Sequence, residues 1–309
     1  MNVKHMDAKK PTIGIIGAGA FGLAIASICA KTQPVVVYTI EADVYASFQK
    51  TRTTKYTRKK LSKNIHMTTD INELSNLNML FVCTPTTALQ SICKQMPATN
   101  ALFIVTSKGL GKNGELPLEL FSKKRTTYMS GPTLAAELSD QLYATIACTK
   151  KEERLLGKLP GFVFEFTQNK QAVQKLSVFK NAFAFLIGVC EATKVSHNHQ
   201  GILFATMFEA FCKKHKIPAR VAHSYAGLAD CYTTSISQTS RNKKAGLYFG
   251  KSRTIPENMT VESQFLFRKL KKSIFPPSFH SLILSLRTAK SIAKKRTIIE
   301  NWCKNGTSR

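Results

Sequence analysis

The sequence predicts an α/β fold class, a mostly parallel sheet covered by helices, followed by an all-α region. Three observations support this prediction. Short apolar runs alternate with helix-like segments in the first half, a glycine-rich turn follows the first run, and strands largely disappear after residue 173. Such alternation is typical of parallel sheets with helices on both faces. We therefore predict two domains, a dinucleotide-binding domain over residues 1–173 and a helical substrate-binding domain over residues 174–309.

Short apolar or β-branched runs predict the strands of the first domain. Helix-like segments such as FGLAIASICAK and TALQSICKQM lie between several of these runs. The predicted strands are residues 12–17, 34–39, 78–85, 101–109, 126–132, 143–150 and 161–168.

Long helical patterns fill the second domain. The segments VQKLSVFKNAFAFLIGVCEATK (173–194) and GILFATMFEAFCKKHK (201–216) show helical periodicity. HSLILSLRTAKSIAKKR (280–296) is a further amphipathic stretch with a basic end. We expect these helices to form a domain that packs on the predicted sheet.

A glycine motif follows the first predicted strand. Gly17, Gly19 and Gly22 form G-x-G-x-x-G at the opening of a helix, the context in which this pattern predicts a Rossmann-like dinucleotide site. Glu41 follows the second strand, about where an acidic residue receives the adenosine ribose hydroxyls. Neither Ile40 nor Glu41 supplies a guanidinium for a 2′-phosphate. This favours NAD over NADP, although nearby lysines and arginines leave NADP open.

The chain is strongly basic. Its 45 Lys and Arg residues against 18 Asp and Glu give a net charge of +27, which favours anionic partners such as phosphorylated metabolites, a membrane surface or nucleic acid. The cations are spread along the whole chain, without aromatic interleaving or a nucleic-acid motif. Solvated surface charge is the simpler interpretation, and no specific nucleic-acid partner is predicted.

The composition also bears on compartment and metals. Eight scattered cysteines form no C-x-x-C pair, and His197 and His199 have no matching ligand cluster. We therefore expect reduced core cysteines and no metal site. No apolar run reaches about 18 residues and no signal peptide is evident at the start, which predicts a cytoplasmic protein without a transmembrane segment.

Several polar residues stand out for chemistry. Lys180 lies within an apolar helical pattern, where partial burial would lower its pKa and suit acid/base work, although a snorkelling lysine is the simpler alternative. The triplets SKG (107–109) and SGP (130–132) follow predicted strands, at the sheet edge where ligands bind. Arg241 suits phosphate recognition. Asp230, in a short polar-flanked turn, could pair with a catalytic lysine.

The ordered motifs GAGAFG, SKG, SGPTLAAE, KNAFAFLIGV, GLADCYTT, SRN and VES resemble those of the bacterial-type NAD(P)-dependent sn-glycerol-3-phosphate dehydrogenases. The resemblance runs from about residue 12 to residue 290. It implies a Rossmann-like domain followed by an all-α domain, NAD or NADP as cofactor, and the interconversion of dihydroxyacetone phosphate and glycerol-3-phosphate, which supplies the backbone of phospholipids. It is compatible with a homodimer, but the sequence does not decide the oligomeric state.

The resemblance also implies roles for individual residues. Lys180 is implied as the acid/base, and Asp230 as the residue that orients or tunes it. The implied substrate-binding residues are Lys108, Gly131, Asn181, Thr234, Ser240, Arg241 and Asn242. The implied cofactor-binding residues are Gly17, Gly19, Ala20, Phe21, Gly22, Glu41, Lys108, Ala135, Arg241 and Glu262. Asn198 and Glu209 match family positions on the helical segments that follow Lys180.

Departures from the family pattern leave alternatives open. The family's YLP is Tyr56-Thr57-Arg58 here, its VEG is Val261-Glu262-Ser263, and the arginine that many relatives carry after the second strand is absent. One alternative is a related reductase acting on a branched keto acid. Another is a catalytically degenerate dinucleotide-binding relative with a sensing or polyanion-binding role. The intact motifs around Lys180 and Asp230 favour the dehydrogenase.

Overall fold

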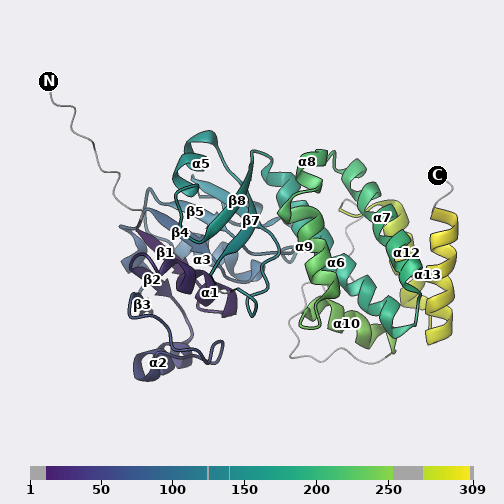
Figure 1. Cartoon of the computed structure of the whole chain (residues 1–309), viewed down its shortest axis with the longest axis horizontal. Coiled ribbons are helices and arrows are strands. Elements are labelled where there is room, and N and C mark those ends of the chain that lie inside the picture. Colours follow the sequence, from purple (N-terminus) through teal and green to yellow (C-terminus); the bar gives the residue numbers. More distant parts are fainter. Residues whose placement is uncertain (1–11, 124, 139, 253–273, 307–309) are drawn as a thin grey trace.

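The computed structural model describes residues 12–123, 125–138, 140–252 and 274–306. Two lobes are visible in Figure 1: a sheet with its covering helices in purple to teal, and a group of helices in green to yellow. The last strand of the sheet, β8, ends at Thr167, and the first helix of the second lobe, α6, begins at Lys170.

The sheet has eight strands in the order β3-β2-β1-β4-β5-β6-β7-β8. All neighbours are parallel except β6 and β7, which are antiparallel. The order reverses at β1, and in open α/β sheets ligands bind outside the carboxyl ends of the strands at such a point. The strands are β1 (Ile13–Ile16), β2 (Val35–Tyr38), β3 (Ile65–Thr68), β4 (Met79–Val82), β5 (Leu102–Val105), β6 (Thr126–Ser130), β7 (Leu142–Ala147) and β8 (Phe162–Thr167).

Strand β3 was not predicted from the sequence. This strand has four residues, IHMT, and the side chain of His66 is exposed, so the run is too short and too polar for an apolar pattern to predict it. It pairs with β2 alone at the edge of the sheet. An edge strand needs one neighbour and one buried face, so a weak local signal suffices once β2 is in place.

Alternate strand residues pack into different cores on the two faces of the sheet. Ile15 and Phe81 belong to one core, and Ile16 and Val82 to the other. The second core continues into the helical lobe through α6, so one apolar interior joins sheet and helices. The helices of the first lobe are α1 (Ala20–Cys29), α2 (Ala42–Thr51), α3 (Leu89–Gln95), α4 (Pro117–Leu120) and α5 (Lys150–Leu156), with short 3₁₀ turns at Ile71–Leu74 and Thr86–Ala88.

Helix α6 (Lys170–Ala192) is the centre of the second lobe, and almost every residue from Ala172 to Cys190 is buried. By length and composition it could cross a membrane, which the search for apolar runs missed. However, 94% of its apolar window is buried inside the structure, as in the core helix of a globular domain. The other elements are α7 (His197–Lys214), α8 (Ala219–Ala222), the π-helical η3 (Tyr225–Ala229), α9 (Asp230–Ile236), α10 (Arg241–Gly250), α12 (Pro277–Thr288) and α13 (Ile292–Gly306).

Two local expectations were wrong. The amphipathic stretch 280–296 is divided between α12 and α13, because Ala289 is extended (φ −77°, ψ 116°) and the Ser291 hydroxyl accepts the backbone N–H of Lys294 to start the next helix. Asp230 does not lie in a turn but begins α9 directly after η3. The eight cysteines, all within the described ranges, are free thiols, and five of them are buried.

Candidate active site

The glycine motif forms a tight turn between β1 and α1. Gly17 has φ 108°, which other residues rarely adopt, and a Cβ on Gly22 would lie 2.0 Å from the Gly17 carbonyl oxygen. A Cβ on Gly19 would meet no atom within 4 Å, so open space lies beside this backbone. Gly19 is the N-cap of α1 and provides no side-chain cap. The uncapped helix N-terminus and the open space fit a dinucleotide pyrophosphate.

Two further predicted cofactor residues begin α1. Ala20 is exposed at the first position of the helix, and Phe21, at the second, packs against the core on that face of the sheet. Glu41 directly precedes α2, at the carboxyl end of β2. Its carboxylate is paired, since Lys55 Nζ lies 2.6 Å from Oε2 and the Tyr56 hydroxyl donates to the same oxygen at 2.9 Å. Neither partner of Glu41 was predicted from the sequence.

A buried carboxylate lies between two lysines. Lys180 Nζ is 2.6 Å from Asp230 Oδ1, and Lys108 Nζ is 3.1 Å from Asp230 Oδ2. The side chain of Asp230 is 1% exposed, that of Lys180 7% and that of Lys108 16%. Asp230 is 50 positions from Lys180 in the sequence and 122 positions from Lys108, yet the three side chains form one cluster.

Neutral groups complete the hydrogen bonding of this cluster. Ser130 donates to Asp230 Oδ2 at 3.1 Å, and the Thr234 hydroxyl accepts from Lys180 at 3.2 Å while donating to the Asp230 carbonyl at 2.7 Å. The Lys108 ammonium also donates to the Gly131 carbonyl at 2.9 Å and to the Thr133 hydroxyl at 3.1 Å. Ser130 and Thr133 were not among the predicted site residues, although both lie in or beside the SGP triplet that placed Gly131 at a strand end.

The sheet positions the loop that carries Lys108. This lysine follows β5, and the Tyr128 hydroxyl donates to the carbonyl of the preceding Ser107 at 2.9 Å. The same hydroxyl lies 2.7 Å from Ser177 Oγ on α6, one turn before Lys180. A buried tyrosine thus connects the Lys108 loop to the helix that carries Lys180.

An unusual backbone segment positions Asp230. The π-helical η3 has a non-helical residue, Gly227 (φ −95°, ψ −107°), and a Cβ there would lie 1.9 Å from the Ala222 carbonyl oxygen. π-Helical segments frequently occur at functional sites. Here the close approach that the glycine permits sets the start of α9, where Asp230 lies.

Two residues of the sheet hold η3 in place. The backbone N–H of Tyr225 donates to Glu165 Oε2 on β8 at 2.7 Å, and the N–H of Ala226 donates to the Thr145 hydroxyl on β7 at 2.9 Å. Thr145 in turn donates to Glu165 Oε2 at 3.1 Å. These bonds attach η3, which leads into the Asp230 helix, to the sheet whose strand β5 precedes Lys108.

Burial sets the charge state of the cluster. The pKa of Lys108 is lowered to about 8, first by burial and further by the cation of Lys180, while Asp230 opposes the shift. Two ammonium groups share a single carboxylate, so the cluster keeps a positive charge when both are protonated. Such a positive site favours an anionic substrate. The lowered pKa also brings proton exchange by Lys108 close to neutral pH.

The SRN segment begins α10. The Ser240 hydroxyl caps the helix by accepting the N–H of Lys243 at 3.3 Å, Arg241 is exposed at the first helical position, and Asn242 is buried. Helix α10 runs parallel to α6 in close contact, since a Cβ on Gly246 would lie 1.9 Å from the Phe185 carbonyl oxygen.

The register between these helices indicates where the SRN segment lies. Gly250 packs on Val189, four residues beyond the Gly246–Phe185 contact. Gly246 also packs on Gly188, and Gly250 on Ala192, so this register places Asn242 about level with Ala184, one turn beyond Lys180 on α6. The start of α10 therefore lies near the level of Lys180 along α6.

Other predicted positions lie outside this cluster. Ala135 is half-buried in the loop after Gly131, while Asn198 and Glu209 are exposed on α7. Glu262 and the VES motif fall outside the described residues.

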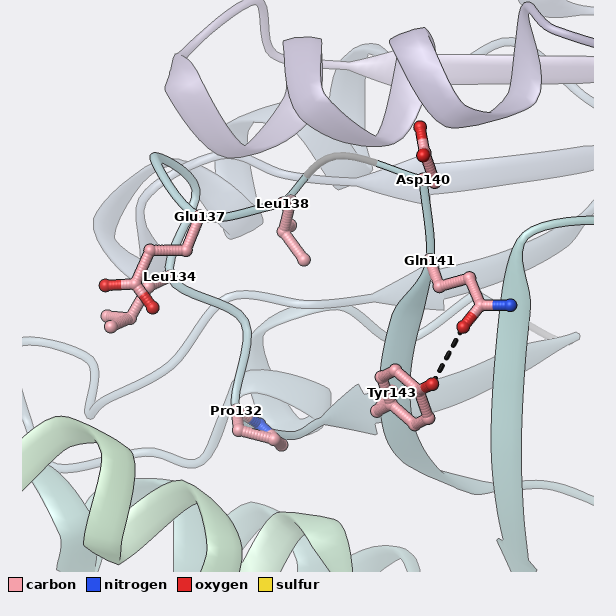
Figure 2. A pocket seen from close by; sticks show the side chains of 7 residues that line it. All are labelled: Pro132, Leu134, Glu137, Leu138, Asp140, Gln141 and Tyr143. Atoms are coloured by element: carbon pink, nitrogen blue, oxygen red, sulfur yellow. Dashed lines mark hydrogen bonds between the residues drawn. The ribbon is translucent and has the colours of Figure 1, made fainter.

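Figure 2 shows side chains that line a hollow beginning at Pro132, directly after Gly131. The volume of this hollow is about 570 Å³. Its wall continues to Tyr143, whose hydroxyl donates to Gln141 at 2.7 Å. Lys108, Lys180 and Asp230 do not line it. The hollow is therefore next to the cluster and separate from it.

Comparison with known proteins matches both lobes of the chain to one family. Residues 12–156 match the family model for the N-terminus of NAD-dependent glycerol-3-phosphate dehydrogenase, and residues 170–272 match the model for its C-terminus. A glycerol-3-phosphate dehydrogenase [NAD(P)+] of Wolbachia from Brugia malayi is 26% identical over 264 residues, which are 78% of this chain and 81% of the relative. The enzyme of the same name from Methanothermobacter thermautotrophicus is 25% identical over 272 residues, 82% of this chain and 85% of the relative.

Solved structures establish the same fold. A glycerol-3-phosphate dehydrogenase from Coxiella burnetii superposes with a TM-score of 0.79 at 18% identity, covering 97% of this chain and 99% of its own. The enzyme from Saccharomyces cerevisiae gives 0.67 at 18% identity, with 96% and 92% covered.

Fold and site together define the class of protein, a two-domain NAD(P)-dependent oxidoreductase with a Rossmann-like sheet and a helical second domain. Within that class, the chain belongs to the NAD-dependent glycerol-3-phosphate dehydrogenase family.

Proposed function

We propose that this protein interconverts dihydroxyacetone phosphate and sn-glycerol-3-phosphate with NAD(P), and that Lys180, Asp230 and Lys108 carry the chemistry. The observation that carries the assignment is the buried Asp230 carboxylate between two lysines, at the carboxyl edge of a sheet with a dinucleotide-type glycine turn. The family resemblance implies that the protein supplies glycerol-3-phosphate for phospholipid synthesis in the cell.

When bound, the nicotinamide supplies a hydride to the middle carbon of the ketone, or accepts one from the alcohol. The ketone oxygen gains negative charge during reduction, and a positioned cation stabilises that charge. Lys180 Nζ donates a proton to this oxygen, which yields the alcohol, and in the reverse direction its neutral amine accepts the proton. Asp230, 2.6 Å away, keeps the lysine oriented.

Lys108 has a second role in this proposal. Its ammonium is held by Asp230, Gly131 and Thr133, and it faces the same buried carboxylate as Lys180. A second cation beside the reacting oxygen would stabilise the charge without itself losing a proton. This accounts for two lysines around one carboxylate.

The substrate phosphate is assigned to the start of α10. Arg241 offers a guanidinium whose planar donors match phosphate oxygens, and the N-terminus of a helix favours anions. Ser240 and Asn242 flank it, and Thr234 and Asn181 lie beside Lys180. The phosphate would anchor the substrate so that its middle carbon meets the lysines.

The cofactor is assigned to the opening of α1 and the end of β2. Gly17 and Gly22 make the turn, Gly19 leaves room for the pyrophosphate, and Glu41 lies where the adenosine ribose is expected. Ala20, Phe21 and Ala135 complete the proposed contacts within the described residues.

The test is the loss of nicotinamide absorbance with NADH or NADPH and dihydroxyacetone phosphate. Native protein is expected to oxidise the reduced cofactor only when the ketone is present, and Lys180→Ala is expected to lose turnover while still binding cofactor. Lys213→Ala, which changes an exposed lysine in the last turn of α7, is the matched control. Absence of turnover with both cofactors in the native protein would contradict the assignment and favour a degenerate dinucleotide-binding relative.

The substrate phosphate separates this activity from that of a keto-acid reductase. Turnover should depend on the phosphate, and a branched keto acid without one should not be reduced. Equal use of both substrates would remove the proposed role of Arg241.

Three further proposals concern the whole molecule. The first is a domain boundary near residue 173; β8 ends at Thr167 and α6 begins at Lys170, a few residues before this position. A homodimer and a cytoplasmic location rest on the family resemblance. Light scattering after size-exclusion chromatography tests the homodimer, and cell fractionation tests the cytoplasmic location.

A further inference from the structure

A tight turn presents two side chains to the carboxyl end of β2. Thr54 and Thr57 exchange backbone hydrogen bonds of 3.1 Å in both directions, so Lys55 and Tyr56 form the tip of the turn. The tip reaches Glu41: Lys55 Nζ lies 2.6 Å from Oε2, and the Tyr56 hydroxyl donates to the same carboxylate. An ammonium group is thus in contact with the residue assigned to the adenosine ribose.

This contact bears on the 2′ position of the ribose. An acidic residue after the second strand of a Rossmann-like fold binds the ribose hydroxyls of NAD, whereas NADP brings a phosphate dianion to the same point. An unpaired carboxylate would repel that phosphate. Lys55 is one hydrogen bond away, and its side chain is 48% exposed on a flexible stem, so its ammonium is able to turn toward a phosphate.

Arg52, one of the two arginines in residues 51–60, is committed elsewhere. Arg52 Nε donates to the Leu61 carbonyl at 3.0 Å, a terminal nitrogen donates to the Ile65 carbonyl at 2.9 Å, and the guanidinium stacks 4.6 Å from the centre of the Phe48 ring. These contacts tie the loop to α2 and β3. Ile40, which is 77% exposed at the strand end, carries no charge.

A second carboxylate keeps Lys55 at this place. Asp43 Oδ2 lies 2.9 Å from Lys55 Nζ, so the lysine retains a partner when Glu41 turns to the ribose. Hydrogen bonds to Glu41 and Asp43 raise the pKa of Lys55, and its ammonium stays charged at neutral pH. The cation is therefore available whichever dinucleotide arrives.

We propose that Lys55 allows this site to accept either dinucleotide: its ammonium stays with the carboxylates of Glu41 and Asp43 when NAD binds and moves to the 2′-phosphate when NADP binds. Lys55 supplies the positive charge that the end of β2 itself lacks, because the residue at that position is Ile40. The inference rests on the proposed function, because it assumes that the adenosine half of the cofactor lies at Glu41.

The test is calorimetric titration of the purified full chain with 5′-AMP and 2′,5′-ADP, which differ only in the 2′-phosphate. Lys55→Met is expected to weaken 2′,5′-ADP binding roughly tenfold or more, the size of one charge-assisted hydrogen bond, and to leave 5′-AMP nearly unchanged. Glu41→Gln is expected to strengthen 2′,5′-ADP relative to 5′-AMP, because it removes a like charge. Lys60→Met, which changes an exposed lysine of the same loop, should alter neither.

Each contrary result has a distinct meaning. Equal binding of 2′,5′-ADP by native protein and Lys55→Met would overturn the proposal, and so would an equal loss for both nucleotides, which indicates only a general attraction. Native binding of 5′-AMP but not of 2′,5′-ADP would also overturn it. If the native protein bound neither nucleotide, the cofactor site of the proposed function would fail as well. Thermal unfolding of each variant checks that the fold is intact.

Discussion

Lys180 Nζ lies 2.6 Å from Asp230 Oδ1, and the two side chains are 7% and 1% exposed. Asp230 also holds Lys108 through its other oxygen at 3.1 Å. Two ammonium groups share this buried carboxylate, so its removal takes the same counter-charge from both. This relationship makes both catalysis and stability sensitive to the same residue.

Asp230→Asn should therefore reduce both activity and stability. Loss of the oriented acid/base is expected to lower kcat/KM roughly 10²- to 10⁴-fold. Breaking a buried ion pair by removing one partner is expected to lower the free energy of unfolding by about 3–5 kcal/mol. Steady-state kinetics and urea denaturation measure the two effects. Wild-type kcat/KM in this variant would show that the carboxylate does not act on Lys180.

The pH dependence of the reduction should report Lys108. Its pKa in the protein is about 8, so its cation is lost as the pH rises through that value. We expect kcat/KM for dihydroxyacetone phosphate, which reports groups of the unliganded enzyme, to fall above pH 8. In Lys108→Arg the guanidinium stays charged, and this falling limb should disappear. A limb that persists at the same pH in the variant would assign it to another group.

The same residue links pH to stability with a definite sign. The pKa of Lys108 is lower in the folded protein than its ordinary value of 10.5. Between about pH 8 and 10.5 the unfolded chain holds the extra proton, so the contribution of this residue to stability rises with pH in that window. Denaturation curves of native protein and Lys108→Met at pH 8 and pH 10 should converge as the penalty of the buried charge disappears.

Two glycines of the same turn should respond differently to alanine. A methyl group on Gly22 would lie 2.0 Å from the Gly17 carbonyl oxygen, so Gly22→Ala should lower the thermal midpoint and weaken NADH binding. Gly19 has an ordinary backbone conformation, and its methyl group would meet no protein atom. Gly19→Ala should leave the thermal midpoint unchanged and weaken only the binding of NADH. Unchanged NADH binding in Gly19→Ala would remove the pyrophosphate from this place.

Glu165 should act on the site from a distance. Its carboxylate accepts the backbone N–H of Tyr225, which starts the segment leading to Asp230. Glu165→Ala leaves that N–H without its partner, and we expect a loss of about 1–3 kcal/mol in stability together with a lower kcat. Glu165→Gln retains an acceptor oxygen and should restore most of both. Wild-type kcat in Glu165→Ala would show that the position of α9 does not depend on this bond.

Much of this molecule follows from local sequence. The glycines at 17, 19 and 22 act through conformational freedom and the space around one turn, and such constraints are visible in neighbouring residues. The apolar runs of seven strands and the helical pattern of α6 are likewise local, because burial selects them by period. The short edge strand β3 was not predicted, because its stability comes from pairing with β2 and not from its own composition.

The chemistry of the site depends on the tertiary structure. The resemblance to a family named Lys180, Asp230 and Lys108, but only the folded chain brings residues 50 and 122 positions apart onto one carboxylate. The fold likewise brings the Ser130 hydroxyl into a hydrogen bond with the Asp230 carboxylate, and Lys55 from a separate turn into contact with Glu41. Period and composition report which residues are buried, whereas the pairing of charges depends on distances that the packing of distant elements sets.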